Sequence, residues 1–133
     1  MAHPRMFDDD DPVLGRLREV ALALPDAAEK VSHGSPAFFT TKVFAYYGGS
    51  VKVGAGYERH GQSLLVLADP AERPALLGDD RFFHPMYLGP SGWVGLDLDA
   101  GTDWGEVREL VETSYRLTAG VRRVRRLDEG TAR

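Results

Sequence analysis

The sequence predicts an α+β two-layer sandwich, in which an antiparallel sheet of five or six strands is covered by three helices. Apolar residues recur at helical spacing in three segments, residues 12–24, 70–77 and 104–117. Between them lie apolar and β-branched runs separated by short turns, the arrangement typical of antiparallel sheets. The expected order is one helix, three or four strands, a short helix, two strands and a long helix.

The first predicted helix has a clear start. Asp11 can accept hydrogen bonds as the N-cap, and Pro12 suits the first helical position because its missing N–H would be unpaired there. Pro25 ends the pattern. Before this helix, the four acids at residues 8–11 repel one another and favour extended chain. We expect a flexible arm over residues 1–10, one domain over residues 11–120 and a basic segment over residues 121–133.

The region after the first helix is predicted to be a strand meander. Gly34 to Pro36 is interpreted as a turn, and Gly48-Gly49 as the turn of a hairpin. The polar, glycine-rich stretch at residues 54–62 is interpreted as a mobile loop. The expected strands are residues 37–41, 43–47, 50–53 and the continuous apolar run at residues 63–68.

A second helix is predicted at Asp69-Pro70, which repeats the cap-and-proline signal, and it ends at Gly78. Residues 82–88 and 93–99 then form two predicted strands around the break at residues 88–92, and residues 96–99 alternate strictly between apolar and polar.

The last long helix begins at Asp103, which with Glu106 resembles a capping box. Ser114 is expected to be buried, with its hydroxyl bonded back to its own helix. Beyond Gly120, residues 121–127 place four arginines between apolar residues. This segment is either a further short helix or a tail that becomes ordered on binding.

Composition excludes several classes of function. The chain of 133 residues has no cysteine, so disulfides, thiolate metal sites and cysteine catalysis are ruled out. No apolar run approaches the ~20 residues that span a bilayer, and no signal peptide precedes the domain, so a cytoplasmic location is expected. Its four histidines lack metal-binding spacing, and no nucleophile elbow is present. We expect no metal, no cofactor and no catalytic residues.

The charged and aromatic residues supply candidate binding positions. A net charge of −4 disfavours nonspecific duplex binding, which depends on phosphate neutralisation, but it allows a local basic patch. Tyr87 and Trp93 are candidates for stacking on a base or ring, or they belong to the core. Arg81 faces a groove, or it pairs with Asp79 or Asp80. The other basic candidates are Lys42, Lys52, Arg122, Arg123, Arg125 and Arg126, of which the four C-terminal arginines bind an acidic partner or pair with Asp128 and Glu129.

An ordered set of short motifs resembles the MmcQ/YjbR family of small bacterial proteins over residues 13–117. The motifs are Ser32-His-Gly-Ser-Pro-Ala-Phe-Phe39, Lys42-Val-Phe-Ala45, Asp80-Arg-Phe-Phe-His-Pro-Met-Tyr87, Gly92-Trp-Val94 and Ser114-Tyr-Arg-Leu117. The resemblance implies a fold similar to frataxin and to type III secretion chaperones. It also implies the "double wing" arrangement for which the family is commonly labelled DNA-binding, and it brings no catalytic residue to this chain.

The sequence therefore predicts a non-enzymatic binding protein of the MmcQ/YjbR type, with nucleic acid as the first candidate partner. The alternative is a module that binds a protein or a small ligand on a sheet face lined by Phe39, Phe44, Tyr87 and Trp93. A continuous basic stripe on the surface would favour nucleic acid, and an apolar concavity would favour the alternative. The oligomeric state is not predicted.

Overall fold

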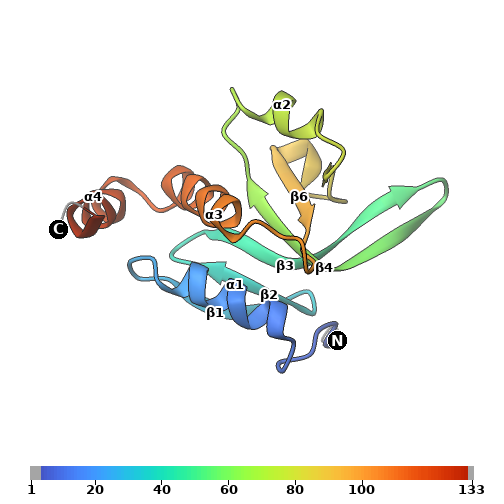
Figure 1. The fold of residues 1–133 in the computed structure, drawn as a ribbon, viewed down its shortest axis with the longest axis horizontal. Helices are drawn as coiled ribbons and strands as arrows, with labels where there is room; N and C mark the ends of the chain where they lie inside the picture. The colour runs from blue at the N-terminus through green and yellow to red at the C-terminus, as the bar shows by residue number, and fades with distance from the viewer. Residues whose placement is uncertain (1–3, 132–133) are drawn as a thin grey trace.

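The computed structural model describes residues 4–131 and confirms the α+β class (Figure 1). A six-stranded antiparallel sheet has the order β1-β2-β3-β4-β6-β5. Residues 1–3 of the expected arm and 132–133 of the basic segment lie outside the described residues. The elements are α1 (Pro12–Leu22), β1 (Ala28–Ser32), β2 (Ser35–Phe39), β3 (Val43–Val53), β4 (Gly56–Leu67), α2 (Arg73–Leu77), β5 (Phe82–Phe83), η1 (Gly89–Ser91), β6 (Trp93–Asp97), α3 (Trp104–Thr118) and α4 (Val121–Thr131).

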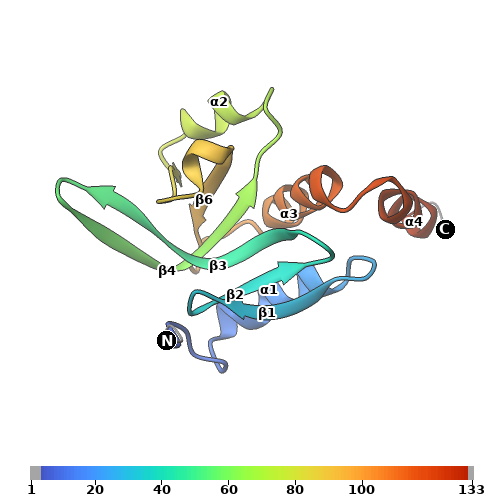
Figure 2. The ribbon, with the colours of Figure 1, turned by 180° about the vertical axis from the view of Figure 1, so that it is seen from behind.

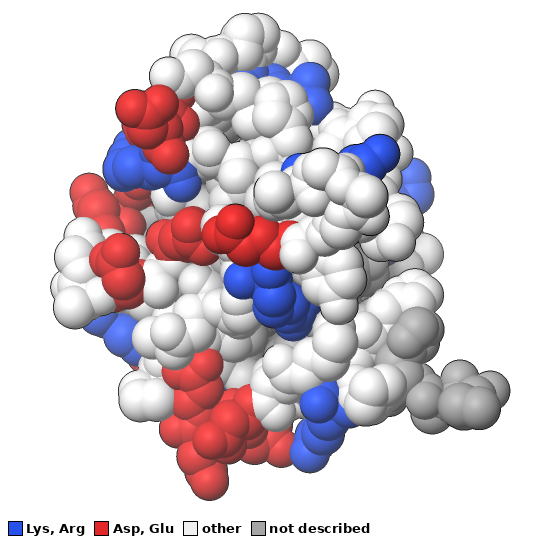
Figure 3. All heavy atoms as spheres, turned by 90° about the vertical axis from the view of Figure 1, so that its right-hand side faces the viewer, with Lys and Arg blue, Asp and Glu red and all other residues white. Residues whose placement is uncertain are grey.

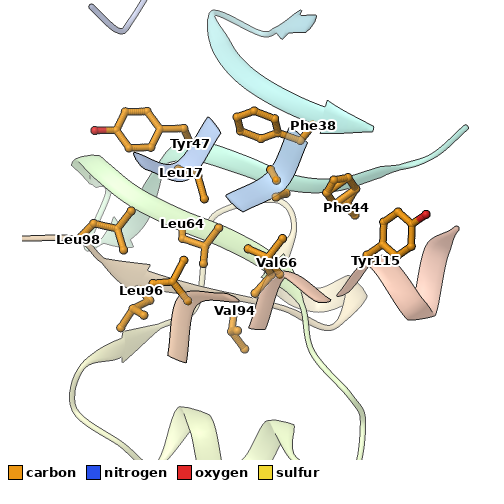
Figure 4. Close-up of a cluster of buried hydrophobic side chains, with 14 of the residues drawn as sticks. Leu17, Phe38, Phe44, Tyr47, Leu64, Val66, Val94, Leu96, Leu98 and Tyr115 are labelled. Carbon is orange, nitrogen blue, oxygen red and sulfur yellow. The ribbon is translucent and has the colours of Figure 1, made fainter. Parts of the chain in front are cut away.

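Helices α1 and α3 pack against one face of the sheet, where both contact β3 and each other. Seen from behind, β1 and β2 lie in front of α1 (Figure 2). The buried apolar side chains between these layers form the core, and Phe44 meets Tyr115 of α3 edge to face at a centroid distance of 5.5 Å (Figure 4). Helix α2 instead lies against β5 and β6 at one end of the sheet. Within residues 4–131, no helix is both long enough and apolar enough to cross a membrane.

The prediction of a turn at Gly48-Gly49 is wrong, because β3 continues through both glycines to Val53. Gly48 has a φ of +90°, and the pairing of β3 with β4 shifts between Tyr47 and Gly49. The glycine pair therefore forms an irregularity of the bulge type within a strand. The hairpin turns farther on, at Gly54-Ala55, since Val53 pairs with Gly56.

The mobile loop predicted at residues 54–62 is also wrong. These residues belong mostly to β4, which runs from Gly56 to Leu67 and so joins the polar stretch to the apolar run. The stretch is polar because the end of the β3–β4 hairpin extends beyond the body of the protein (Figure 1) and is exposed to solvent.

The turn predicted at Gly34 to Pro36 lies at His33-Gly34 instead, because Ser35 and Pro36 belong to β2 and pair with Ser32 and Val31 of β1.

The later part of the chain also differs from the sequence expectation. Strand β5 is limited to Phe82–Phe83, paired with β6 at Leu96 and Gly95, and residues 84–88 are irregular chain followed by a turn. Asp69 caps a turn by accepting a hydrogen bond from the Ala71 amide at 2.8 Å, so α2 starts only at Arg73. Of the two alternatives for the basic segment, the structure shows a helix, α4, which is a fourth helix beyond the three expected.

Ser114 does not bond back to its own helix as expected. Its buried hydroxyl donates to the Phe44 carbonyl at 2.6 Å and accepts from the Leu67 amide at 3.0 Å. One side chain thereby links α3 to both β3 and β4. Both backbone groups would lose this partner if the hydroxyl were removed, and unpaired polar groups in a core are costly.

We expect Ser114→Ala to lower the free energy of unfolding by about 1–3 kcal/mol, measured by urea denaturation. Thr118→Ala is the matched control, since the Thr118 hydroxyl bonds to the Ser114 carbonyl of its own helix at 2.9 Å. The control should cost less than about 0.5 kcal/mol. Equal losses for the two variants would contradict a special role for the Ser114 hydroxyl.

Asp11 ties the start of α1 to the sheet. Its carboxylate accepts hydrogen bonds from the Val13 amide, the buried Tyr47 hydroxyl and the Gln62 side chain. Burial acts to raise the pKa of Asp11, but these hydrogen bonds outweigh it and hold the pKa below its usual value. The ionised carboxylate therefore stabilises the folded state.

The contribution of Tyr47 to stability should depend on pH. Because the pKa of Asp11 is lower when folded, its contribution is present above the unfolded pKa of about 4 and is lost as pH falls through the folded pKa. Tyr47→Phe should cost about 1 kcal/mol near pH 7 and less near pH 3, measured by urea unfolding at both values.

Tyr115→Phe is the control for that experiment, because the Tyr115 hydroxyl donates to the uncharged Pro25 carbonyl at 2.8 Å. Its cost should be the same at both pH values. A loss for Tyr47→Phe that is also independent of pH would contradict the role given to the Asp11 carboxylate.

Candidate ligand-binding groove

A groove with a volume of about 910 Å³ lies on the face of the sheet opposite α1 and α3. We call it the sheet groove. It is bounded by the β1–β2 turn, the middle of β3 and β4, and the segment that follows β5. Its lining residues are Met6, Ser32, His33, Ser35, Tyr46, Gly48, Gly49, Ser50, Tyr57, Arg59, Leu65, Met86, Tyr87 and Leu88.

The alternation of side chains along β3 and β4 creates the floor of the groove. Tyr47 and Leu64 are paired and buried in the core, so the next pair, Tyr46 and Leu65, points to the opposite face. Tyr46 is held from the side by Trp93, at a ring-centroid distance of 5.5 Å. An aromatic and an aliphatic side chain thus give the groove an apolar base.

The two glycines of β3 leave room above its backbone. A Cβ atom at Gly49 would lie 2.8 Å from Cδ2 of Leu65, and a Cβ atom at Gly48 would lie 2.8 Å from Nη2 of Arg59. Real Cβ atoms do not come so close to other atoms. The missing side chains therefore allow Leu65 and Arg59 to lie across the strand.

Arg59 is the cation of the groove. Its Nη1 donates to the Gly49 carbonyl at 3.3 Å, which turns the guanidinium back over β3. Arg59 as a whole is exposed, but desolvation of its guanidinium by neighbouring groups lowers its pKa, with Tyr57 acting in the opposite direction. Within residues 4–131, Arg59 forms no ion pair. A partly desolvated positive charge thus faces the groove without a carboxylate to neutralise it.

The rim of the groove contains two residues in the left-handed region. His33 has a φ of +52° and Tyr87 a φ of +67°, and a bulky residue such as tyrosine is rare there. The Met86 amide donates to the Ser50 carbonyl at 2.8 Å and fixes this segment against β3. Tyr87 is nevertheless 87% exposed. Such conformations cost about 1–3 kcal/mol and cluster at functional sites.

The far end of the hairpin continues this surface. Ser50 pairs with Arg59 and Lys52 pairs with Tyr57, so these four side chains share one face of the hairpin. Tyr57 is 68% exposed. Lys52, predicted from the sequence as a binding residue, therefore lies on the face that lines the groove, two residue pairs farther from the body than Arg59.

The aromatic sheet face expected from the sequence does not form as predicted. Of its four members only Tyr87 lines the sheet groove. Phe44 is fully buried in the core against Tyr115, because it faces the helices. Trp93 is 9% exposed and supports Tyr46, and Phe39 packs beneath the ammonium of Lys30 at 4.7 Å.

Arg81, another predicted binding residue, is engaged in ion pairs. It contacts the carboxylates of Asp79 and Glu106, each at 2.8 Å. The hydrogen bond from Arg81 holds the pKa of Asp79 below its usual value. Of the alternatives considered for Arg81, the structure shows the pairing with Asp79.

The arginines of α4 divide into two groups. Arg123 and Arg126 contact Asp26 at 3.1 and 2.9 Å, and these hydrogen bonds lower the pKa of Asp26. Asp128, expected to pair with them, instead contacts Arg116 at 2.7 Å. Arg122 and Arg125 are exposed and form no ion pair within the described residues.

Lys42 lies in the β2–β3 turn, and this turn reaches α4 through a 3.3 Å hydrogen bond from Arg123 to Thr41. The predicted basic residues therefore occupy separate places: Lys52 on the hairpin, Arg81 before β5, and Lys42 with the arginines at α4. On the face shown in Figure 3, acidic and uncharged side chains separate the basic ones. That face has no continuous basic stripe.

Sequence reasoning missed Tyr46, Tyr57 and Arg59. The sequence analysis interprets residues 54–62 as a loop, although Tyr57 and Arg59 lie on strand β4. The signal in the sequence was the symmetry of the chain around Gly54-Ala55. A hairpin that turns there pairs residue 50 with residue 59 and residue 52 with residue 57, with all four side chains on one face. Because the sequence analysis places the hairpin turn at Gly48-Gly49, it does not predict the strand that carries Tyr57 and Arg59.

Comparisons with known proteins agree with the fold. The YjbR family model matches residues 22–117. The structure is similar to the crystal structure of Deinococcus radiodurans protein DR2400, described with the domain DUF419, with a TM-score of 0.57 and 21% identity over 78% of this chain and 76% of that chain. A search of curated proteins gave no match. Because the family model covers most of its length, the chain belongs to the YjbR family.

Proposed function

We propose that this YjbR-family chain is a non-enzymatic binding protein and that a small ligand occupies the sheet groove. The observation that supports this most is the unpaired Arg59 in a groove of about 910 Å³ with an apolar floor. Ligand sites are typically concave and mostly apolar, with a few polar groups that orient the ligand. Tyrosine hydroxyls and Ser50 supply such groups here.

Binding without catalysis accounts for the groups in the groove. The Ser32 hydroxyl lies 3.2 Å from Nδ1 of His33, but a contact between consecutive residues at a turn is a local one. Among the described residues, no cluster of three or more histidines and carboxylates is placed to hold a metal ion. That the chain is not an enzyme remains part of this proposal.

Filling the groove tests the proposal. Ser50→Phe places a large side chain in the groove on a strand that favours aromatic residues, and Val53→Phe is the matched control on the other face of the same hairpin, where Val53 is 53% exposed. In a screen of aromatic fragments followed by ¹H–¹⁵N NMR, we expect shifts at the amides of Tyr57, Arg59 and Tyr87. Ser50→Phe should abolish these shifts and Val53→Phe should retain them.

Two outcomes of that screen would contradict the proposed function. One is that fragments shift only residues elsewhere, for example in the shallow groove between α3 and α4 that Arg125 and Leu117 line. The other is that Ser50→Phe binds fragments as well as the unmodified protein does. Each outcome would mean that the sheet groove is not the binding site.

Nucleic acid is a second candidate partner, favoured by the exposed, unpaired Arg122 and Arg125 on α4 with Lys42 at the neighbouring turn. Their location at one end of the molecule offers a small phosphate-binding patch despite the net charge of −4. The double-wing arrangement and the cytoplasmic location expected from the sequence stay predictions with this candidate.

Salt dependence tests the nucleic-acid candidate. Binding of a mixed-sequence DNA duplex, measured by fluorescence anisotropy, should weaken between about 50 and 200 mM salt, and Arg122→Ala/Arg125→Ala should reduce the salt slope by about 2. Arg123→Ala/Arg126→Ala should change it less, because Asp26 already pairs with both arginines. Undetectable binding at the lower salt concentration would eliminate this candidate.

A further inference from the structure

We propose that the ligand of the sheet groove is a planar organic anion, whose carboxylate, sulfonate or phosphate group is bound by Arg59 and whose flat part lies against the tyrosines. This inference rests on the proposed function and specifies the class of ligand. It follows from the charge of the groove, from the aromatic side chains beside that charge and from the way in which Arg59 is held.

The charge of the groove favours an anion. The Arg59 guanidinium has one described hydrogen bond, to the Gly49 carbonyl at 3.3 Å, although guanidinium groups present five donors. Arg18, Arg81, Arg116, Arg123 and Arg126 each contact a carboxylate, whereas Arg59, like Arg73, Arg122 and Arg125, forms no ion pair among the described residues. What distinguishes Arg59 is its place: it lines the sheet groove and lies over bare glycine backbone, where an incoming anion would accept hydrogen bonds from its remaining donors.

The side chains around Arg59 favour a flat ligand. Tyr57 and Tyr87 are both largely exposed although they line the same groove, and Tyr46 lies in its floor. Exposed aromatic rings beside a cation stack on planar groups and present hydroxyls at their edges. The strained backbone of Tyr87 places this ring at the rim before a ligand arrives. A simple inorganic anion would leave these rings unused.

Arg59, and not positive charge in general, is the anchor. Lys52 lies on the same face of the hairpin, paired with Tyr57, but does not line the groove. A guanidinium is planar and offers two parallel donors to a carboxylate, sulfonate or phosphate, whereas an ammonium is a point charge. Lys52 therefore provides a control of equal charge at a neighbouring position.

A pair of fluorescent probes tests this inference. Anilinonaphthalene sulfonate combines a flat naphthalene ring system with an anionic sulfonate, and phenylnaphthylamine has the same rings without the sulfonate. We expect the purified full chain to bind the anion about tenfold more tightly than the neutral probe. Arg59→Met should remove about tenfold of the anion's affinity and leave the neutral probe unchanged, while Arg59→Lys should restore part of the loss.

Lys52→Met should change the affinity for the anion by less than about threefold, since its charge is lost outside the groove. Ser50→Phe should eliminate the binding of both probes. Thermal unfolding of each variant establishes that it is folded before binding is compared.

The two proposals fail in different ways. If Ser50→Phe eliminates both probes but Arg59→Met binds the anion as before, the groove binds ligands and the assignment of an anion is wrong. Equal losses for Lys52→Met and Arg59→Met would also overturn the role of Arg59. If neither probe binds, or if Ser50→Phe has no effect, both the groove and its anion are rejected.

Discussion

The glycine pair in the middle of β3 is the constraint on which the groove depends. Gly48 adopts a φ of +90°, which other residues rarely adopt, and side chains at either position would collide with Arg59 or Leu65. The pair shifts the register of the central hairpin without ending the strand. One local feature therefore keeps the sheet continuous and leaves a strip of bare backbone on which a cation can lie.

The opposite face of the same strands is held by polar contacts of a different kind. Ser114 joins α3 to β3 and β4, and Asp11 joins the start of α1 to Tyr47 of β3. These contacts fix the helical layer at two points around the apolar core (Figure 4). Because α1 and α3 cover one face so completely, the groove forms on the other, where no long helix packs against the strands.

The ion pairs of the surface explain why a basic sequence segment is a poor guide to binding in this protein. Asp26 forms ion pairs with two arginines of α4, and Asp79 and Glu106 both form ion pairs with Arg81. The pairs with Asp26 and Glu106 join different segments, so they stabilise the docking of elements more than they offer charge to a partner, whereas Asp79 pairs with Arg81 within one segment. The cation in the groove, Arg59, also contacts no carboxylate among the described residues, but it differs from the unpaired arginines of α4 in that it lies against backbone beside tyrosines in a concave surface.

The sequence by itself determined the α+β class, the antiparallel sheet and the two long helices with their caps at Asp11 and Asp103, because these depend on local periodicity and capping residues. Its ordered motifs also resembled the family to which the chain belongs. It could not determine the path of β3 and β4, because a Gly-Gly pair permits either a turn or a bulge. The bulge is selected by the pairing of β3 with β4 on both sides of the glycines, at Tyr47 with Leu64 and at Ser50 with Arg59. The tertiary structure also decided which arginines find acids distant in sequence, such as Asp26 for Arg123. The groove belongs to this second group, because its lining comes from segments that only the folded sheet brings together.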